Sequence, residues 1–253
     1  DGVGSVGVYL GPDADGTIVV YNTISAFTTG ILADGDSTNL IETVTLAYNT
    51  INADRGIETE YVDSSSVSDN VISATSYGII LDYTTNVGIR DNEITGSSGS
   101  TTGISVSDGC DMITIANNRI SGFHDGIFVE LSTNVAIDGN EVYSCYTGIS
   151  ADLTGPAGSD IGIQISNNVV HDVTNEAIDV EEITSGTATV SGNHVTSAYY
   201  GIYIDSVSNI VIQGNTISNV DYGIYGMSYV ATITNNNIQD VDEDAINLYN
   251  FDT

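Results

Sequence analysis

The stretch GNTISNVDYGIY, residues 214–225, recurs along the chain with few changes. Close copies are NNRISGFHDGIF at 117–128, GNEVYSCYTGIS at 139–150 and GNHVTSAYYGIY at 192–203. Each copy holds an Asn, then Ile or Val two residues later, then a Gly-Ile step. Self-similarity at a regular spacing is typical of repeat proteins, so this unit decides the architecture.

Aligning the unit over the whole chain gives a series of Asn residues that lie 21 to 28 residues apart. A shortest period of 21–22 residues, with occasional longer units, indicates a solenoid. The series is Asn22, Asn49, Asn70, Asn92, Asn118, Asn140, Asn168, Asn193, Asn215 and Asn236.

Apolar residues alternate with polar ones before most of these Asn residues, as in Ile113 and Ile115 or Ile210 and Ile212. Alternation at period two indicates strands, each with only two or three inward residues before a turn. Helical repeats are disfavoured, because the units are rich in Ile, Val, Thr, Ser and Gly and poor in strong helix formers. We therefore expect an all-β, single-stranded parallel β-helix of about ten coils of ~22 residues.

The recurring Asn has a physical explanation in such a fold. Stacked coils lie about 4.8 Å apart, so the same position in each coil sits above its predecessor. An inward polar side chain needs hydrogen-bond partners, and Asn carries both a donor and an acceptor. We expect an internal Asn ladder, and we expect the Gly before each Ile to allow a sharp corner. The ladder includes Asn92, Asn118, Asn140, Asn168, Asn193, Asn215 and Asn236.

With this Asn ladder and these Gly-Ile steps, residues 17–250 resemble the right-handed parallel β-helix repeats of the pectate-lyase-like superfamily. The resemblance, like the general rule for parallel crossovers, implies a right-handed coil. The superfamily includes pectate lyases, polygalacturonases, alginate epimerases, phage tailspikes, adhesins and archaeal surface proteins. It therefore implies a fold and a carbohydrate-related, secreted or surface setting, but no single function.

The charge balance is extreme, with 34 acidic residues, three Arg, no Lys and a net charge of −31. Such a surface repels phosphate, so we expect no nucleic-acid partner. No apolar run approaches the roughly 20 residues that span a bilayer, so we expect no membrane insertion. The composition suits cations, high salt or an extracellular or cell-surface environment.

Residues 1–253 are interpreted as one β-helix domain. The first residues do not form a signal peptide, and neither end carries an amphipathic capping helix. We expect either an excerpt or processed piece of a longer surface protein, or coils of separate chains that stack end to end.

If the Ile of each Gly-Ile step is counted as position one, position four points outward. In most coils this position holds a carboxylate, so the carboxylates form a column. Neighbouring charges at this spacing repel by roughly 0.9 kcal/mol even in bulk water. The column is either a solvated face of a salt-adapted protein or a set of Ca²⁺ sites, with Glu130, Asp152 and Glu181 as metal candidates. Its members are Asp34, Glu60, Asp82, Glu130, Asp152, Glu181 and Asp205.

A second outward column places aromatic rings beside these carboxylates. Tyr203 and Tyr225 lie on adjacent coils, where they are either a platform for sugar rings or ordinary strand residues. Loops at 35–43, 153–162 and 182–187 border the same face, and such insertions often flank a binding surface. We expect a groove over coils five to eight, with substrate-binding candidates Asp179, Tyr203, Asp205 and Tyr225.

Catalysis by paired carboxylates is compatible with this column. Adjacent coils approach the roughly 5 Å carboxylate separation of retaining glycosidases, and coils two apart approach that of inverting ones. The catalytic candidates are Glu130, Asp152 and Glu181. The polygalacturonase pattern of Asn-Thr-Asp, Asp-Asp and Gly-His-Gly is absent.

Other reactive residues are scattered. The three Arg lie on different coils, which disfavours lyase or epimerase chemistry, and Arg55 is expected to offset the charge of Glu58 and its acidic neighbours. The three His occupy different phases of the coil, so no zinc site is expected. His124 with Asp125 and Glu130 forms the only local acid–base cluster worth mutating. The two Cys also differ in phase, so no disulfide is expected.

Three hypotheses follow. The first is a secreted or cell-surface β-helix with a structural, adhesive or glycan-binding role. The second is a carbohydrate-active enzyme, most plausibly a glycosidase. The third is a filament subunit.

Overall fold

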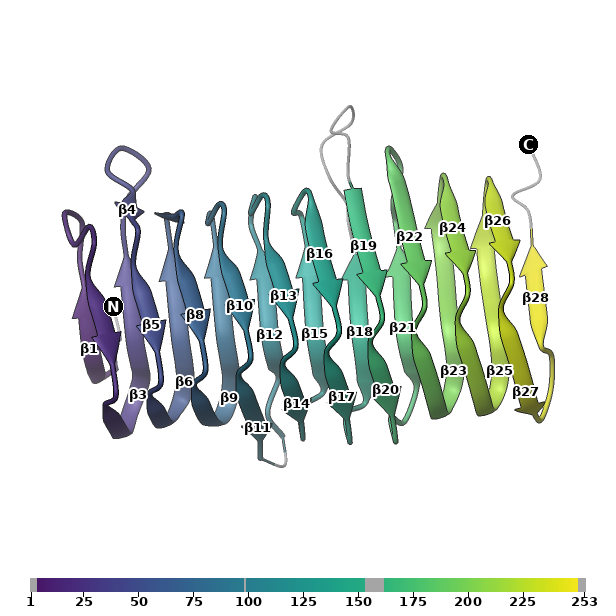
Figure 1. The fold of residues 1–253 in the computed structure, drawn as a ribbon, viewed down its shortest axis with the longest axis horizontal. Helices are drawn as coiled ribbons and strands as arrows, with labels where there is room; N and C mark the ends of the chain where they lie inside the picture. The colour runs from purple at the N-terminus through teal and green to yellow at the C-terminus, as the bar shows by residue number, and fades with distance from the viewer. Residues whose placement is uncertain (1–3, 98, 153–161, 250–253) are drawn as a thin grey trace.

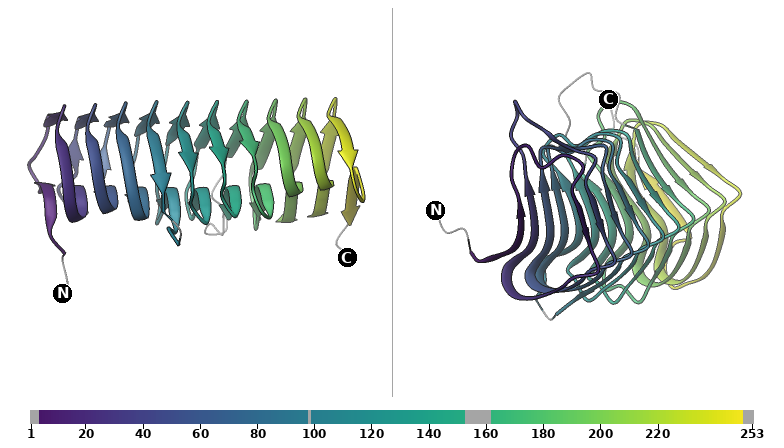
Figure 2. Two further views of the ribbon diagram at one scale, coloured as in Figure 1. Left: turned by 90° about the horizontal axis from the view of Figure 1, so that it is seen from below. Right: turned by 60° about the vertical axis from the view of Figure 1, so that its left-hand side comes forward.

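The computed structural model describes residues 4–97, 99–152 and 162–249, so most of the loop predicted at 153–162 lies outside the described residues. The described chain forms a rod of stacked coils, from β1 (Val6–Leu10) at one end to β28 (Ile246–Tyr249) at the other (Figure 1). These residues form 28 strands and no helix. Seen obliquely along the rod, the coils lie one behind another (Figure 2). No helix able to cross a membrane occurs in this part of the chain.

Each coil passes through three walls. The strands of the Asn wall follow the ladder Asn. The strands of the Gly-Ile wall contain the Gly-Ile step. The strands of the third wall form a separate 10-stranded sheet. The Asn and Gly-Ile walls join at a corner into one 16-stranded sheet. A further two-stranded sheet pairs β4 (Ile41–Glu42) with β7 (Val62–Asp63).

Long bent strands run through both walls in five coils, namely β3 (Thr23–Asp34), β6 (Thr50–Glu60), β9 (Val71–Asp82), β23 (His194–Val207) and β25 (Thr216–Ser228). The shorter strands of the Asn wall are β11 (Glu93–Gly96), β14 (Arg119–Ser121), β17 (Glu141–Tyr143), β20 (Val169–His171) and β27 (Asn237–Val241). The Gly-Ile wall contains β1, β28, β12 (Thr102–Ser107), β15 (Asp125–Glu130), β18 (Thr147–Asp152) and β21 (Glu176–Glu181). The third wall contains β2 (Ile18–Val20), β5 (Thr45–Ala47), β8 (Ser66–Ser68), β10 (Gly88–Arg90), β13 (Thr114–Ala116), β16 (Val135–Asp138), β19 (Gly162–Ser166), β22 (Thr187–Ser191), β24 (Ile210–Gln213) and β26 (Ala231–Thr234).

Successive coils pair in parallel, with the repeat units in register. In the Gly-Ile wall Ile104 lies opposite Ile127, which lies opposite Ile149. In the Asn wall Ile94 lies opposite Ile120. The predicted parallel β-helix and the alignment of its units are therefore confirmed.

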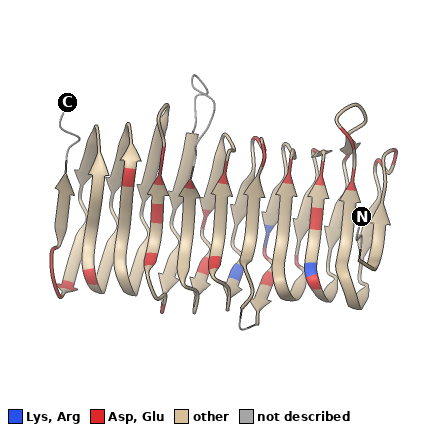
Figure 3. Cartoon of the chain, turned by 180° about the vertical axis from the view of Figure 1, so that it is seen from behind, with Lys and Arg blue, Asp and Glu red and all other residues tan. Residues whose placement is uncertain are grey.

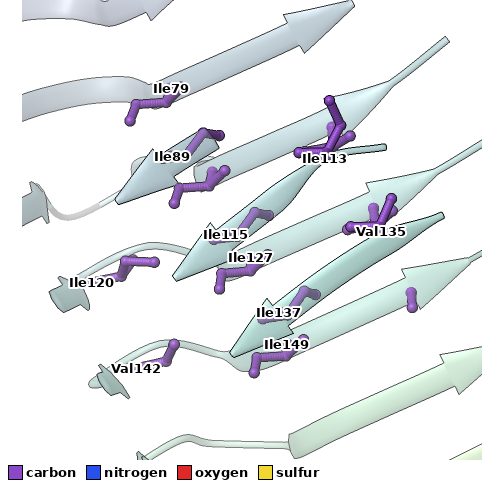
Figure 4. Packing of buried hydrophobic residues seen from close by; sticks show 14 of the residues in the cluster. Ile79, Ile89, Ile113, Ile115, Ile120, Ile127, Val135, Ile137, Val142 and Ile149 are labelled. Atoms are coloured by element: carbon purple, nitrogen blue, oxygen red, sulfur yellow. The ribbon is translucent and has the colours of Figure 1, made fainter. Parts of the chain in front are cut away.

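The core consists of columns of Ile and Val that all three walls contribute (Figure 4). Ile115 and Ile137 from the third wall, Ile127 and Ile149 from the Gly-Ile wall, and Ile120 from the Asn wall have no exposed surface. Burying each such side chain stabilises the fold by about 1.5–3 kcal/mol. The inward positions are mostly Ile and Val, the β-branched residues that pack well in strands.

Hydrogen bonds join the ladder residues in one unbroken series from Asn22 to Asn236. The Nδ2 atom of each Asn donates to the Oδ1 atom of the next at 2.9–3.1 Å. The backbone N–H of each Asn donates to the same oxygen, as Asn118 does to Asn140 at 2.9 Å. The same Nδ2 reaches a carbonyl of the preceding coil, as Asn140 does to Ile115 at 2.9 Å. The buried amides thus satisfy one another as expected.

The backbone conformation of the residue directly before each ladder Asn explains why Gly-Asn, Asn-Asn and Asp-Asn pairs recur in the sequence. At all ten positions this residue has a positive φ between 55° and 68°. Gly, Asn and Asp adopt this left-handed conformation at low cost, so they dominate the corner. Tyr21 and Tyr48 adopt it in the first two coils.

The Gly before each Ile has a different role from the predicted one. Gly103 does not lie in the left-handed region, so the corner does not need its backbone freedom. A Cβ atom there would lie 2.4 Å from the carbonyl oxygen of Gly126 and 2.4 Å from Cγ2 of Ile120. At Gly103, two walls and the next coil approach too closely for a side chain, whereas β21 has Ala177 at the equivalent position.

Candidate functional site

The outward side of the Gly-Ile wall carries three side-chain columns. We call the part formed by β15, β18, β21, β23 and β25 the carboxylate–tyrosine face. The first column contains the residues directly before each Gly-Ile or Ala-Ile step. The second column contains the residues directly after the Ile of that step, and the third is the predicted acidic column. Acidic residues recur along the whole rod, whereas basic residues are few (Figure 3).

The acidic column is in register on adjacent strands. Glu130 pairs with Asp152, Asp152 with Glu181, and Glu181 with Asp205. At the other end of the rod Asp34 pairs with Glu60. The next coil has Met227 at this position, so the column ends at Asp205. The alternation in the sequence therefore assigned these side chains to the correct face.

Burial and the charges of neighbouring carboxylates raise the pKa of two members of the column, Glu130 and Glu181. Burial raises the pKa of Glu130, and Asp108, Asp152 and Asp82 raise it further. Burial likewise raises the pKa of Glu181, followed by the charges of Asp152 and Asp205. These carboxylates have neighbours of like charge, so a bound cation or high salt would stabilise them.

The strongest perturbation lies in the second column, at Asp179. Burial, followed by the charges of Glu181 and Glu176, raises its pKa to about 8. Its Oδ2 atom accepts a long hydrogen bond of 3.4 Å from Ser150. Its Oδ1 atom is buried and has no hydrogen-bond partner among the described residues. The raised pKa favours the protonated form of Asp179 beside the carboxyl groups of Glu176 and Glu181, an environment that is typical of acid–base sites.

Sequence reasoning placed Asp179 among the substrate-binding residues and assigned catalysis to Glu130, Asp152 and Glu181. A signal for its special environment was present in the stretch NEAIDVEE, residues 175–182. It places Glu176, Asp179 and Glu181 on the outward side of a single strand, β21. Three carboxylates on one strand cannot all ionise at ordinary pKa values when their neighbours are also acidic.

Six tyrosines extend the face toward β25 and β28. Tyr203 and Tyr225 stack with ring centroids 6.2 Å apart, and Tyr200 and Tyr222 stack at 5.3 Å. The two pairs contact each other, since Tyr200 lies 5.2 Å from Tyr203. Tyr199 and Tyr249 pack edge-on against this group. Burial, then the surrounding tyrosines, raises the pKa of Tyr200 to about 12.

The platform directly adjoins the acid cluster. Tyr203 lies opposite Asp179, and Tyr200 lies opposite Glu176, on adjacent strands. Burial raises the pKa of Tyr203, with Asp205 and Glu181 as the next causes. The structure therefore brings together the predicted residues Asp179, Glu181, Tyr203, Asp205 and Tyr225.

A hollow of about 360 Å³ lies on the same wall, toward the N-terminal end of the face. It opens in front of β12 and reaches Glu130. It overlaps the groove predicted over coils five to eight only at its first coil, at β15. The hollow forms where small residues of β12 face outward between bulkier residues on each side.

Arg55 forms the expected ion pair with Glu58, at 3.1 Å and 3.2 Å from its two carboxylate oxygens. His124 contacts Asp125 at 3.0 Å, but no contact joins it to Glu130 in the described structure. A second group of titratable side chains surrounds His171. His171 contacts Asp172 at 2.8 Å and Glu141 at 3.6 Å, because parallel stacking brings β17 and β20 together.

Arg119 completes this second cluster on the Asn wall. It contacts Glu141 at 2.8 Å and lies 4.6 Å above the ring of Tyr143, which stacks on His171. The pairs are exposed, and such surface ion pairs contribute little to stability. The two cysteines, Cys110 and Cys145, are free and buried. Within the described ranges, no three His, Cys, Asp or Glu side chains are grouped to hold a metal ion.

A family model described as "Right handed beta helix region" matches residues 6–157, 55–203 and 125–253. The chain belongs to the right-handed β-helix family. The matches overlap because the repeats resemble one another, and together they cover almost the whole chain. No curated protein sequence matches the chain.

Solved structures with the same right-handed β-helix fold include enzymes and an adhesin. DFA-IIIase from Arthrobacter chlorophenolicus A6 is 15% identical with a TM-score of 0.70, over 87% of this chain and 60% of the enzyme. A hyperthermoactive exopolygalacturonase from Thermotoga maritima is 14% identical with a TM-score of 0.64, over 81% and 55%. PfbA, a surface adhesin of Streptococcus pneumoniae, is 13% identical with a TM-score of 0.60, over 93% and 83%. The chain therefore spans about 60% of the length of the DFA-IIIase. At these identities the similarity shows the shared fold alone.

Proposed function

We propose that the carboxylate–tyrosine face binds a polysaccharide or cell-surface glycan. The observation that carries this proposal is the tyrosine platform, because Tyr203 and Tyr225 stack beside Asp179, Glu181 and Asp205. Aromatic rings pack against the apolar faces of sugar rings, and carboxylates accept hydrogen bonds from sugar hydroxyls. Together they provide both kinds of contact that a sugar needs.

Electrostatics narrows the class of glycan. The net charge is −31, and the face itself is acidic. A uronate or sulfated polymer would be repelled by several carboxylates at once. The ligand is therefore a neutral or cationic glycan that lies across successive strands of the face.

The structural neighbours are compatible with this proposal. DFA-IIIase has been solved in complex with GF2 and with DFA-III, and PfbA is a surface adhesin. For this chain we infer a secreted or cell-surface location and a binding or adhesive role. The acidic column at Glu130, Asp152 and Glu181 would bind Ca²⁺ or be adapted to salt. End-to-end self-association stays a prediction, which light scattering over a range of protein concentrations tests.

A second candidate function, glycoside hydrolysis, is favoured by Asp179. A carboxyl with a pKa near 8 holds the proton that a general acid must give to a leaving oxygen. Asp152 and Glu181 lie on adjacent strands in register and would supply the second carboxylate, as base or nucleophile. This assigns the acid role to Asp179 rather than to Glu130.

Binding is tested by isothermal titration with neutral oligosaccharides drawn from a glycan array. Replacing Tyr203 and Tyr225 together with Ala should weaken binding at least tenfold. The matched control is the Tyr21→Ala, Tyr48→Ala double variant, since these rings also stack, at 5.1 Å, but lie in the first coils. Equal affinities of the two double variants and the wild type would refute the platform.

Hydrolysis is tested by reducing-sugar release from the polymer that binds. If the second candidate is correct, the wild type releases product and Asp179→Asn abolishes release while it retains binding. Binding without release by the wild type would restrict the function to recognition.

A further inference from the structure

The hollow in front of β12 has a defined origin. Its floor is formed by Thr102, Ser105 and Ser107. The same columns hold Tyr77 and Ile80 on β9, and Asp125 and Phe128 on β15. Small residues on one strand between larger ones on both neighbours leave a gap of about 360 Å³ in the wall.

Ser105 places an unused polar group on this floor. Its side chain points outward, yet only 8% of its surface is exposed. Its hydroxyl forms no hydrogen bond with any described residue, whereas the neighbouring Ser107 donates to Asp82 at 2.6 Å. An outward hydroxyl without a protein partner on the floor of a hollow is available to a polar ligand.

The hollow strongly favours positive charge. Five carboxylates line the hollow. The one cationic side chain in its lining, Arg55, forms an ion pair with Glu58. Glu130 has no hydrogen bond to its carboxylate from the described residues, and its pKa is raised. An ammonium group would relieve this repulsion, whereas an anion would add to it. The carboxylates are Glu58, Asp82, Asp108, Asp125 and Glu130.

The walls of the hollow favour an organic cation over a metal ion. Tyr77 and Phe128 present aromatic rings from the two neighbouring strands. An aromatic ring attracts an ammonium group and also packs against the apolar face of a sugar. The carboxylates are spread around the hollow, and no three of them group as metal ligands in the described chain.

We propose that this hollow binds an amino sugar of a glycan, with its ammonium group near Glu130, its ring against Phe128 and a hydroxyl on Ser105. The proposal rests on glycan binding by the adjoining face and names the class of glycan, a polymer that contains unacetylated amino sugars. Such a chain would pass from the hollow over β15 and β18 to the tyrosine platform.

The experiment compares three tetramers by isothermal titration at low salt: glucosamine, N-acetylglucosamine and neutral glucose. The glucosamine tetramer should bind at least tenfold more tightly than the other two. The Glu130→Gln variant should remove this preference, and Ser105→Phe should block the hollow. Asp34→Asn is the control, because Asp34 lies on the same wall at the far end of the rod. Circular dichroism verifies that each variant is folded.

Equal binding of the glucosamine and N-acetylglucosamine tetramers would overturn the proposal. If spermidine binds as tightly as the glucosamine tetramer, the hollow recognises organic cations in general, and the assignment to a sugar is refuted. Loss of glucosamine binding in millimolar CaCl₂, but not in NaCl of equal ionic strength, would assign the hollow to a metal ion instead. A preference for glucosamine that persists in the Tyr203→Ala, Tyr225→Ala variant would support the hollow even if the tyrosine platform failed its own test.

Discussion

Replacing Asp179 with Asn should stabilise the protein at alkaline pH. The folded state raises the pKa of Asp179 from an ordinary 3.8 to about 8. Between these values the folded chain retains a proton that the unfolded chain has released. The free energy of unfolding therefore falls as the pH rises from about 4 to 8. Asn carries no such proton, so the variant should lose less stability over this range.

The magnitude follows from the pKa. A pKa of about 8 instead of 3.8 corresponds to roughly 6 kcal/mol, at 1.36 kcal/mol per pH unit. Asp179 keeps partial contact with water, and its neighbours relax when it ionises, so we expect less than half of this, about 2–3 kcal/mol. For a protein of this size, that difference raises the melting temperature by about 5–10 °C.

The assay is thermal unfolding followed by circular dichroism at pH 4, 6 and 9. Wild type and Asp179→Asn should melt close together at pH 4 and diverge as the pH rises, with the variant more stable. Asp205→Asn is the matched control, since it removes one charge from the adjacent strand of the same face. Parallel curves for wild type and Asp179→Asn, or an equal gain in Asp205→Asn, would refute the assignment of a buried proton to Asp179.

Three further outcomes are expected. Asn140→Ala should lower the free energy of unfolding in urea by about 3 kcal/mol, because buried groups of Asn118 and Ile115 lose their partners. Asn22→Ala, at the exposed end of the ladder, should cost less than half as much, and equal losses would contradict a continuous ladder. Leu131→Asn should raise stability by roughly 0.5–1 kcal/mol, since Leu131 has φ of 45°, whereas Leu131→Ala should not. NaCl should raise the melting temperature by screening the acidic column, and CaCl₂ at equal ionic strength should raise it further if the column binds calcium.

The repeat made the fold predictable from local information. Each coil uses the same period-two alternation and the same Asn, so aligning the units also aligned the strands in space. This is why the outward position of Glu130, Asp152 and Glu181 followed from counting residues after the Gly-Ile step. The reason for the glycine in that step did not follow from the sequence. A Cβ atom at position 103 would clash with the carbonyl oxygen of Gly126, and this distance depends on how closely the coils pack.

Amino-acid order alone thus determined the parallel β-helix, the Asn ladder and the acidic outward column, because these depend on spacing within a unit and on stacking of identical positions. Only the tertiary structure singled out Asp179, joined six tyrosines into a platform and opened a hollow over Ser105. These features depend on the sizes and charges of side chains from different coils, 22 to 29 residues apart in the chain. Burial and Coulomb interactions act between such neighbours in space, and a one-dimensional pattern does not contain their distances.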